Sequence, residues 1–323
     1  MKLVGTLVRV FGVLLMLTAL AIPLVRAPDR AVQTLVARWA PPPSDFLDLQ
    51  GQLVHYRDEG PRSDPSPIVL LHGTSASLHT WEGWAKSLRG QRRVISFDLP
   101  GFGLTGPFAG HYAGRDYSAA EMARFTLDVI DALGVKRFVV GGNSLGGEVA
   151  WRVAAAEPAR VEKLLLVDAG GYAVAPQSIP LGWRLARLPG LSTLLEHVLP
   201  RPLVASGLVD VYGDPKRINE ALVDRYFELT LREGNRRALV QRLRHVKFGG
   251  DEAQIASLKL PTLILWGGRD RIIAPALAQR FKADIAGSEL VLFDMLGHVP
   301  HEEDPDATVL PVKAFLAAAV RAP

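Results

Sequence analysis

One serine between glycines carries the strongest chemical signal of the 323-residue chain. Residues 142–146 read Gly-Asn-Ser-Leu-Gly and match the pattern G-x-S-x-G, whose small outer residues permit a very sharp turn. An apolar segment at 138–140 precedes the motif, and a helical pattern at 145–156 follows it. This order of strand, turn and helix predicts that Ser144 is an exposed nucleophile at a helix N-terminus. The alternative interpretation is a glycine-rich turn in which the serine only caps the helix.

A serine nucleophile needs a base that takes its proton and an acid that orients the base. Asp270 follows an apolar segment at 262–266, and His298 follows another at 290–293. Both therefore lie where strands are expected to end, and the chain order Ser, Asp, His is usual for this motif. We predict a catalytic triad of Ser144, Asp270 and His298.

The acid and the base each have a competitor in the sequence. His301 is a second histidine close to His298, but Gly297 permits the tight loop that a catalytic histidine needs, which favours His298. Asp168 also follows an apolar segment, so it is the alternative acid.

Acyl transfer also needs two backbone N–H groups that stabilise the negative oxygen of the tetrahedral intermediate. We predict that Leu145, the residue after the nucleophile, supplies one of them. Thr74 is expected to supply the other, from the loop at 72–75 that follows an apolar segment at 68–71. This chemistry requires neither a cofactor nor a metal.

The elements around these residues alternate in type. Two short strands at 46–51 and 52–57 are predicted to form a hairpin with a glycine turn. Short apolar segments then predict buried parallel strands at 68–71, 94–97, 138–140, 164–167, 262–266 and 290–293. Helical patterns lie between or after them, at 81–88, 119–133, 145–156, 275–285 and 305–320. The alternation predicts an α/β fold with a doubly wound, mostly parallel sheet and helices on both faces.

One interval, residues 172–256, breaks the alternation. It shows helical patterns at 182–188, 217–231 and 236–246 and no convincing strand. We predict a helical cap above the strand C-termini, where open α/β sheets bind ligands. Six basic residues cluster in it, namely Arg232, Arg236, Arg237, Arg242, Arg244 and Lys247. They are interpreted as a solvated helix face, with contact to anionic lipid headgroups as the alternative.

The N-terminus carries an uncharged apolar segment at 10–25, preceded by Lys2 and Arg9. Its length is marginal for a membrane span, and the residues at its end make a poor cleavage site. We expect residues 1–30 to be a retained signal anchor that leaves the catalytic domain on the periplasmic or extracellular face, with a cleaved signal peptide as the alternative. Residues 31–45, which include three consecutive prolines, are predicted to be a stiff extended linker.

Composition excludes several other function classes. The chain has no cysteine, which rules out disulfides, thiol nucleophiles and cysteine-ligated zinc. Its histidines lack the spacing of a helical zinc motif, so no metal is expected. The formal net charge is only +4 and forms no dense basic stripe on the catalytic part, so nucleic acid is not an expected partner.

Several motifs together resemble the α/β-hydrolase superfamily, in its capped branch with a serine nucleophile, over roughly residues 46–320. They are His72-Gly73, Asp-Leu-Pro-Gly-Phe-Gly-Leu-Thr at 98–105, Gly-Asn-Ser-Leu-Gly-Gly at 142–147, Gly-Arg-Asp270 and Gly-His298. Haloalkane dehalogenases and epoxide hydrolases of that branch place an aspartate where this chain has Ser144, so the resemblance disfavours both.

The glycine-serine motif is also similar to that of hydrolases that cleave C–C bonds in ring-fission products. This chain has Val299 where those enzymes often carry tryptophan, and Thr-Ser-Ala-Ser replaces their glycine-rich loop. The resemblance therefore favours a carboxylesterase over a C–C bond hydrolase.

Taken together, these observations predict a membrane-anchored serine hydrolase that acts on a small apolar ester or acyl substrate. C–C bond hydrolysis or acyl transfer on the same triad is one alternative, and a non-catalytic binding protein of the same fold is another. The predicted division of the chain is an anchor or signal segment at 1–30, a linker at 31–45, a hydrolase core at 46–171 and 257–323, and a cap at 172–256.

Overall fold

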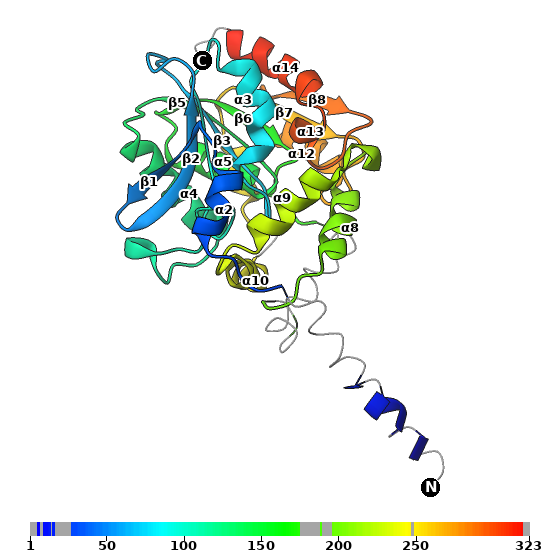
Figure 1. Cartoon of the computed structure of the whole chain (residues 1–323). Helices are drawn as coiled ribbons and strands as arrows, with labels where there is room; N and C mark the ends of the chain where they lie inside the picture. Colours follow the sequence, from blue (N-terminus) through cyan, green and yellow to red (C-terminus); the bar gives the residue numbers. More distant parts are fainter. Residues whose placement is uncertain are drawn as a thin grey trace.

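The computed structural model describes residues 5–6, 9–13, 15–16, 27–174, 188, 196–246 and 249–318. Its centre is an eight-stranded sheet with the strand order β1-β2-β4-β3-β5-β6-β7-β8 (Figure 1). The strands are β1 (Ser44–Leu49), β2 (Gln52–Glu59), β3 (Ile68–Leu71), β4 (Val94–Phe97), β5 (Phe138–Asn143), β6 (Val161–Val167), β7 (Thr262–Gly267) and β8 (Glu289–Phe293). β2 pairs antiparallel with β1 and with β4, and all other pairings are parallel. The predicted doubly wound, mostly parallel sheet is confirmed.

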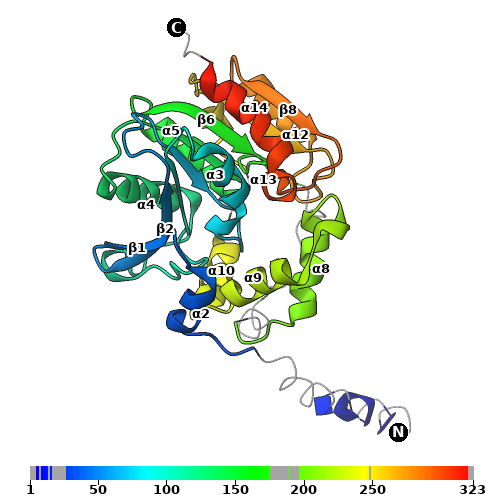
Figure 2. The same ribbon diagram turned by 45° about the horizontal axis from the view of Figure 1, so that its top comes forward.

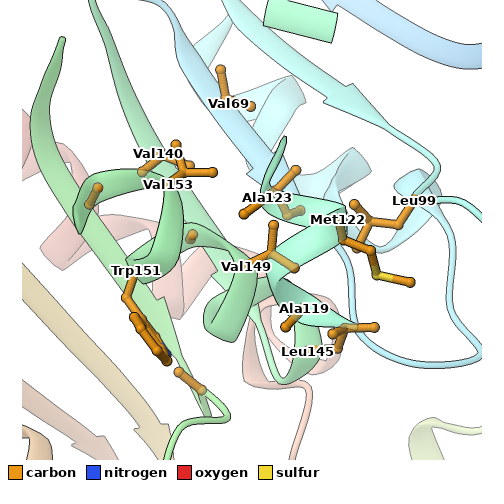
Figure 3. Close-up of a cluster of buried hydrophobic side chains, with 14 of the residues drawn as sticks. Val69, Leu99, Ala119, Met122, Ala123, Val140, Leu145, Val149, Trp151 and Val153 are labelled. Atoms are coloured by element: carbon orange, nitrogen blue, oxygen red, sulfur yellow. The ribbon is translucent and has the colours of Figure 1, made fainter. Parts of the chain in front are cut away.

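Helices cover both faces of the sheet, because side chains alternate along each strand between two cores (Figure 2). Val69 of β3 faces one core, and its neighbour Leu70 faces the other. Figure 3 shows the first core, in which Val140 of β5 faces Val149 and Val153 of a helix. The helices over the first face are α4 (Ala119–Ala132), α5 (Leu145–Ala156) and α12 (Ala276–Asp284), and those over the second are α3 (Glu82–Leu88) and α14 (Pro305–Ala317).

Each predicted strand and helix of the core occurs, with ends shifted by a few residues. β5 runs on to Asn143, so Gly141 and Gly142 belong to the strand, and a Cβ on Gly141 would lie 2.9 Å from the Cβ of Leu165 on β6. Short helical turns not predicted from the pattern are η1 (Leu78–Trp81), η2 (Gly110–Tyr112) and α13 (Pro300–Glu303).

The described part of the cap is helical. It contains α8 (Arg201–Val211), η4 (Pro215–Arg217), α9 (Glu220–Thr230) and α10 (Asn235–His245), and α11 (Glu252–Ala256) leads back to the core. α9 and α10 correspond to predicted helices. The sequence pattern misses α8, because Pro202 and Gly207 are poor helix formers. The helix predicted at 182–188 lies outside the described residues, apart from Leu188.

Residues 31–45 do not form the predicted extended linker. Val32–Trp39 form helix α2, whose Leu35 is 1% exposed and packs against Leu104 of the core and Leu229 of α9. Apolar residues three and four positions apart in 32–39 do favour a helix. The three prolines at 41–43 led the sequence analysis to predict an extended linker instead. α2 lies beside α9 in both views (Figures 1 and 2).

Polar contacts also bind this part of the chain to α9. We call residues 27–40, which include α2, the docked segment. The guanidinium of Arg38 donates to Glu228 at 2.8 Å and to Asp224 at 3.0 Å, and both acceptors belong to α9. The indole N–H of Trp39 donates to the other oxygen of Glu228 at 2.7 Å. The docked segment is therefore bound to the cap by apolar packing and by charge.

We expect Leu35→Ala to destabilise this docking by about 2–3 kcal/mol, the usual cost of truncating a well-packed leucine. Amide hydrogens of α2 and α9 should then exchange faster, as measured by native-state hydrogen exchange. Gln33→Ala, an exposed position of the same helix, is the control and should leave exchange unchanged. Unchanged exchange of α9 in Leu35→Ala would show that the docked segment does not support the cap.

The predicted anchor at 1–30 lies for the most part outside the described residues. Among the residues that are described, no helix is both long enough and apolar enough to cross a membrane. Within the apolar stretch at 10–25, the described side chains of Val10, Phe11, Val13, Leu15 and Met16 are between 51% and 64% exposed.

Candidate active site

A sharp turn between β5 and α5 holds Ser144. Its backbone has φ 55° and ψ −116°, a conformation that strains a residue with a side chain. The turn also needs its glycines: a Cβ on Gly142 would lie 2.1 Å from the carbonyl oxygen of Gly146, and a Cβ on Gly146 would lie 2.1 Å from that of Leu71. The strand, turn and helix thus follow in the predicted order. Ser144 is only 8% exposed, rather than open to solvent as predicted, because a neighbouring loop lies beside it.

Asp270 and His298 meet beyond the ends of β7 and β8. Nδ1 of His298 lies 2.7 Å from Oδ2 of Asp270, a hydrogen bond between two buried side chains. The other oxygen of Asp270 accepts the N–H groups of Ile272 at 2.7 Å and Ile273 at 2.9 Å. The backbone N–H of His298 donates to the carbonyl of Val211, at the end of α8, at 2.7 Å. The imidazole is therefore oriented by a fixed carboxylate.

His301, the competing base, lies against aromatic rings instead. Its ring centroid is 4.0 Å from that of Trp81, and the residue is 1% exposed. Burial, and then the neighbouring His298, hold the pKa of His301 well below its ordinary value. No described residue forms a hydrogen bond with its Nδ1. The geometry favours His298 over His301 as the base.

Two side chains that the sequence analysis misses connect these loops. The side-chain amide of Asn143 donates to the carbonyl of His298 at 2.8 Å, which ties the residue before Ser144 to the histidine loop. The carboxylate of Glu303 accepts the N–H of Gly297 at 2.8 Å and that of Gly213, in the cap, at 3.0 Å. Asn143 occupies a variable position of G-x-S-x-G, and Glu303 lies in no motif, so no sequence signal identifies them.

The loop after β3 lies beside Ser144, because a Cβ on Gly73 would be 3.1 Å from the serine Cβ. Thr74 is the next residue. His72 fixes the loop, since its Nδ1 donates to the Gly73 carbonyl at 2.7 Å and its Nε2 accepts the N–H of Leu99 at 2.9 Å. Burial lowers the pKa of His72, which keeps the ring in the neutral form that these two bonds require. The loop with Thr74 and the N-terminus of α5 thus come together at Ser144.

Asp98 is a fully buried carboxylate behind that loop. It accepts hydrogen bonds from Nδ1 of His55 and from the N–H groups of Leu78 and Leu104, each at 2.7 Å. Burial acts to raise the pKa of Asp98, but His55 and the other nearby histidines outweigh burial and hold it well below the ordinary value. The ionised carboxylate therefore joins three segments around the site.

The basic face expected on the cap forms only in part, because Arg237 and Arg244 are exposed whereas Arg236 and Arg242 are buried. Arg236 and Arg242 are 4% and 6% exposed, so they are not on a solvated or lipid-facing surface. Arg242 donates to the carbonyl of Tyr117 at 2.7 Å, and Arg236 donates to Asp29 of the docked segment at 2.5 Å. Arg242 and Arg236 therefore connect α10 to the loop at Tyr117 and to the docked segment. Lys247 of the predicted cluster lies outside the described residues.

Asp168, Asp270 and His298 bring atoms of metal-ligand type within 4.8 Å of one another in the described part of the chain. Two ligands of a tetrahedral zinc ion lie roughly 3.4 Å apart, given metal–ligand distances of about 2.1 Å. The 2.7 Å contact between His298 and Asp270 is shorter than that separation and fits a shared hydrogen atom. The arrangement suits a hydrogen bond that orients the imidazole better than it suits a metal ion.

Residues 68–310 match the model of the Alpha/beta hydrolase family. The chain therefore belongs to this family and is a hydrolase. Both the fold and the family agree with the predictions made from the sequence.

Relatives of this chain are named for different hydrolase activities. The chain is 28% identical over 293 residues to a 2-hydroxy-6-oxononadienedioate/2-hydroxy-6-oxononatrienedioate hydrolase of Pseudomonas sp, covering 85% of this chain and 96% of that one. It is 29% identical over 262 residues to Lipase 1 of Psychrobacter immobilis, covering 77% and 76%. The crystal structure of a bacterial membrane phospholipase A has the same fold, with a TM-score of 0.70 at 23% identity over 98% of this chain and 96% of that one.

Proposed function

We propose that this protein is a serine hydrolase that cleaves carboxylic esters through an acyl-enzyme. The observation that carries the proposal is the 2.7 Å hydrogen bond between buried His298 and Asp270, at strand ends beside the strained turn of Ser144. A relative named Lipase 1, 29% identical to this chain, supports an ester as the substrate.

In the proposed reaction, Oγ of Ser144 attacks the ester carbonyl carbon while His298 takes the hydroxyl proton. The N–H groups of Thr74 and Leu145 stabilise the oxyanion of the tetrahedral intermediate. His298 then gives the proton to the leaving alcohol oxygen, and the C–O bond breaks to leave an acyl-enzyme. Water attacks that acyl group with His298 again as the base, and the acid is released. Asp270 stays ionised and orients the imidazole throughout.

A panel of p-nitrophenyl esters of graded acyl length, together with a fluorophosphonate probe, tests the proposal. We expect hydrolysis of at least part of the panel and covalent labelling at Ser144, identified by mass spectrometry of the labelled peptide. A folded protein that neither hydrolyses the esters nor takes the label would contradict the proposal. That result would favour a non-catalytic binding protein of this fold.

C–C bond hydrolysis on the same triad is the second candidate, because a relative of that activity is 28% identical to this chain. One feature disfavours C–C hydrolysis: the residue after His298 is Val299, where the C–C hydrolases that the motif resembles often carry tryptophan. Val299 is 3% exposed and packs with Leu208 and Tyr212 of the cap. The ratio of kcat/KM for a p-nitrophenyl ester and for a 2-hydroxy-6-oxodienoate distinguishes the two. We expect the ester to be the better substrate.

We further propose that the N-terminal segment holds the enzyme at a membrane, with the catalytic body on the periplasmic or extracellular face. The uncharged segment at 10–25 supports this, as does the exposure of its described apolar side chains. We expect the full chain to co-sediment with phosphatidylcholine vesicles, and the chain without residues 1–25 to stay in the supernatant. Equal sedimentation of the two chains would contradict the proposal.

A further inference from the structure

Asp168 is a buried carboxyl group to which the reaction above assigns no role. It follows β6 directly, is 0% exposed and has φ 44°, a left-handed conformation that aspartate tolerates better than most residues. This turn directs the side chain toward the end of β7, where the N–H of Gly267 donates to Oδ1 at 2.9 Å. The fold thus holds Asp168 beside the loop that carries Asp270.

The second oxygen of Asp168 is buried and receives no hydrogen bond from a described donor. A buried carboxylate oxygen without a donor is costly. The carboxyl group of Asp270 is a hydrogen-bonding neighbour of the Asp168 side chain, and atoms of Asp168, Asp270 and His298 all lie within 4.8 Å of one another. Asp270 accepts from His298, Ile272 and Ile273, so it acts as the ionised acceptor. The hydrogen atom between the two carboxyl groups therefore belongs to Asp168.

The electrostatics of the site point in the same direction. Burial, and then the negative charge of Asp270, raise the pKa of Asp168 well above its ordinary value, and Glu303 adds to this effect. The described titratable groups that face Asp168 are Asp270, His298 and Glu303, and none of these three is a permanent cation. Two carboxylates in contact inside a protein do not both ionise readily. The pair therefore holds one proton and one negative charge at neutral pH.

We propose that Asp168 is a positioning residue of the triad: a neutral carboxylic acid whose O–H donates to Asp270 and holds that carboxylate against His298. The inference rests on the proposed function and deepens it. The proton stays on Asp168 during turnover, and no bond to it breaks. Asp270 carries the negative charge. Asp168, the alternative acid of the sequence analysis, therefore positions Asp270 and does not replace it.

Two substitutions of Asp168 separate this role from a merely structural one. In Asp168→Asn the side-chain carbonyl can accept from Gly267 and the amide can donate to Asp270, without a titrating proton. Asp168→Ala removes the donor. We expect the asparagine variant to keep kcat within about threefold of the parent, and the alanine variant to lose about 10- to 100-fold in kcat with KM changed by less than about threefold.

The acid limb of the kcat/KM profile against pH is a second readout. Without the O–H of Asp168, the carboxylate of Asp270 binds the imidazolium more strongly, so His298 releases its proton at a higher pH. We expect the acid midpoint of Asp168→Ala to lie about one pH unit above that of the parent, and that of Asp168→Asn to lie within a few tenths of it. Asp58→Asn is the control, because the buried carboxylate of Asp58 pairs with Arg93 at 2.8 Å on β2, which β4, β3 and β5 separate from β6.

Infrared spectroscopy tests the proton without turnover. The difference spectrum between the parent and Asp168→Asn at pH 8 should contain the C=O stretch of a protonated carboxyl group. Absence of that band overturns the inference, as does a loss of kcat in Asp168→Asn as large as that in Asp168→Ala, or an alanine variant that behaves like the parent. If the band is present but Ser144→Ala retains ester hydrolysis, the proposed function fails and the assignment of the proton to Asp168 stands.

Discussion

Ser144→Ala is expected to lower kcat for ester hydrolysis on the order of a million-fold, the typical cost of removing a triad nucleophile. The free energy of unfolding should change little, because the side chain of Ser144 forms no capping hydrogen bond with α5. Hydrolysis of the best p-nitrophenyl ester and urea denaturation of the same preparation measure the two quantities.

Ser63→Ala is a suitable control for this variant, since Ser63 is exposed in the loop before β3. It should match the parent in both measurements. Ser144 would not be the nucleophile if its alanine variant kept more than a few per cent of the parent activity.

His298→Ala should cost kcat a factor of similar size, on the order of a million-fold, because no other described base contacts Asp270. His301→Ala should behave differently. It removes a ring that stacks on Trp81, so it should lower the melting temperature while kcat per folded molecule stays within about tenfold of the parent. Circular dichroism, which does not depend on an activated serine, gives the folded fraction of each preparation. Equal losses of kcat in the two variants would contradict the choice of His298.

The core of the fold could be predicted because its signals are local. A strand buried on both faces is a short apolar segment, as at Ile68–Leu71, and G-x-S-x-G describes a turn that only small residues permit. The chain order of Ser144, Asp270 and His298 predicted the candidate site, because parallel strands bring their carboxyl ends to one edge of the sheet.

Features that depend on distant partners could not be predicted in the same way. The helix at Val32–Trp39 is short, and its stability comes from α9, which lies far along the chain. Arg236 and Arg242 look like surface residues until the groups that they contact, Asp29 and Tyr117, are known. The sequence predicted Asp270 rather than Asp168 as the acid, but the positioning role proposed for Asp168 depends on its proximity to Asp270, which the sequence does not show.

Helix α2 also decides where the chain can be shortened for assay or crystallisation. A protein that begins at Ser44 would leave the apolar surface of Leu229 bare where Leu35 now covers it. It would also remove the guanidinium shared by Asp224 and Glu228, two carboxylates one turn apart on α9 that then repel each other. A shortened protein that begins at Ala27 would lose the apolar segment yet keep both contacts. Its cap should therefore be the better surrogate for the cap of the full-length protein.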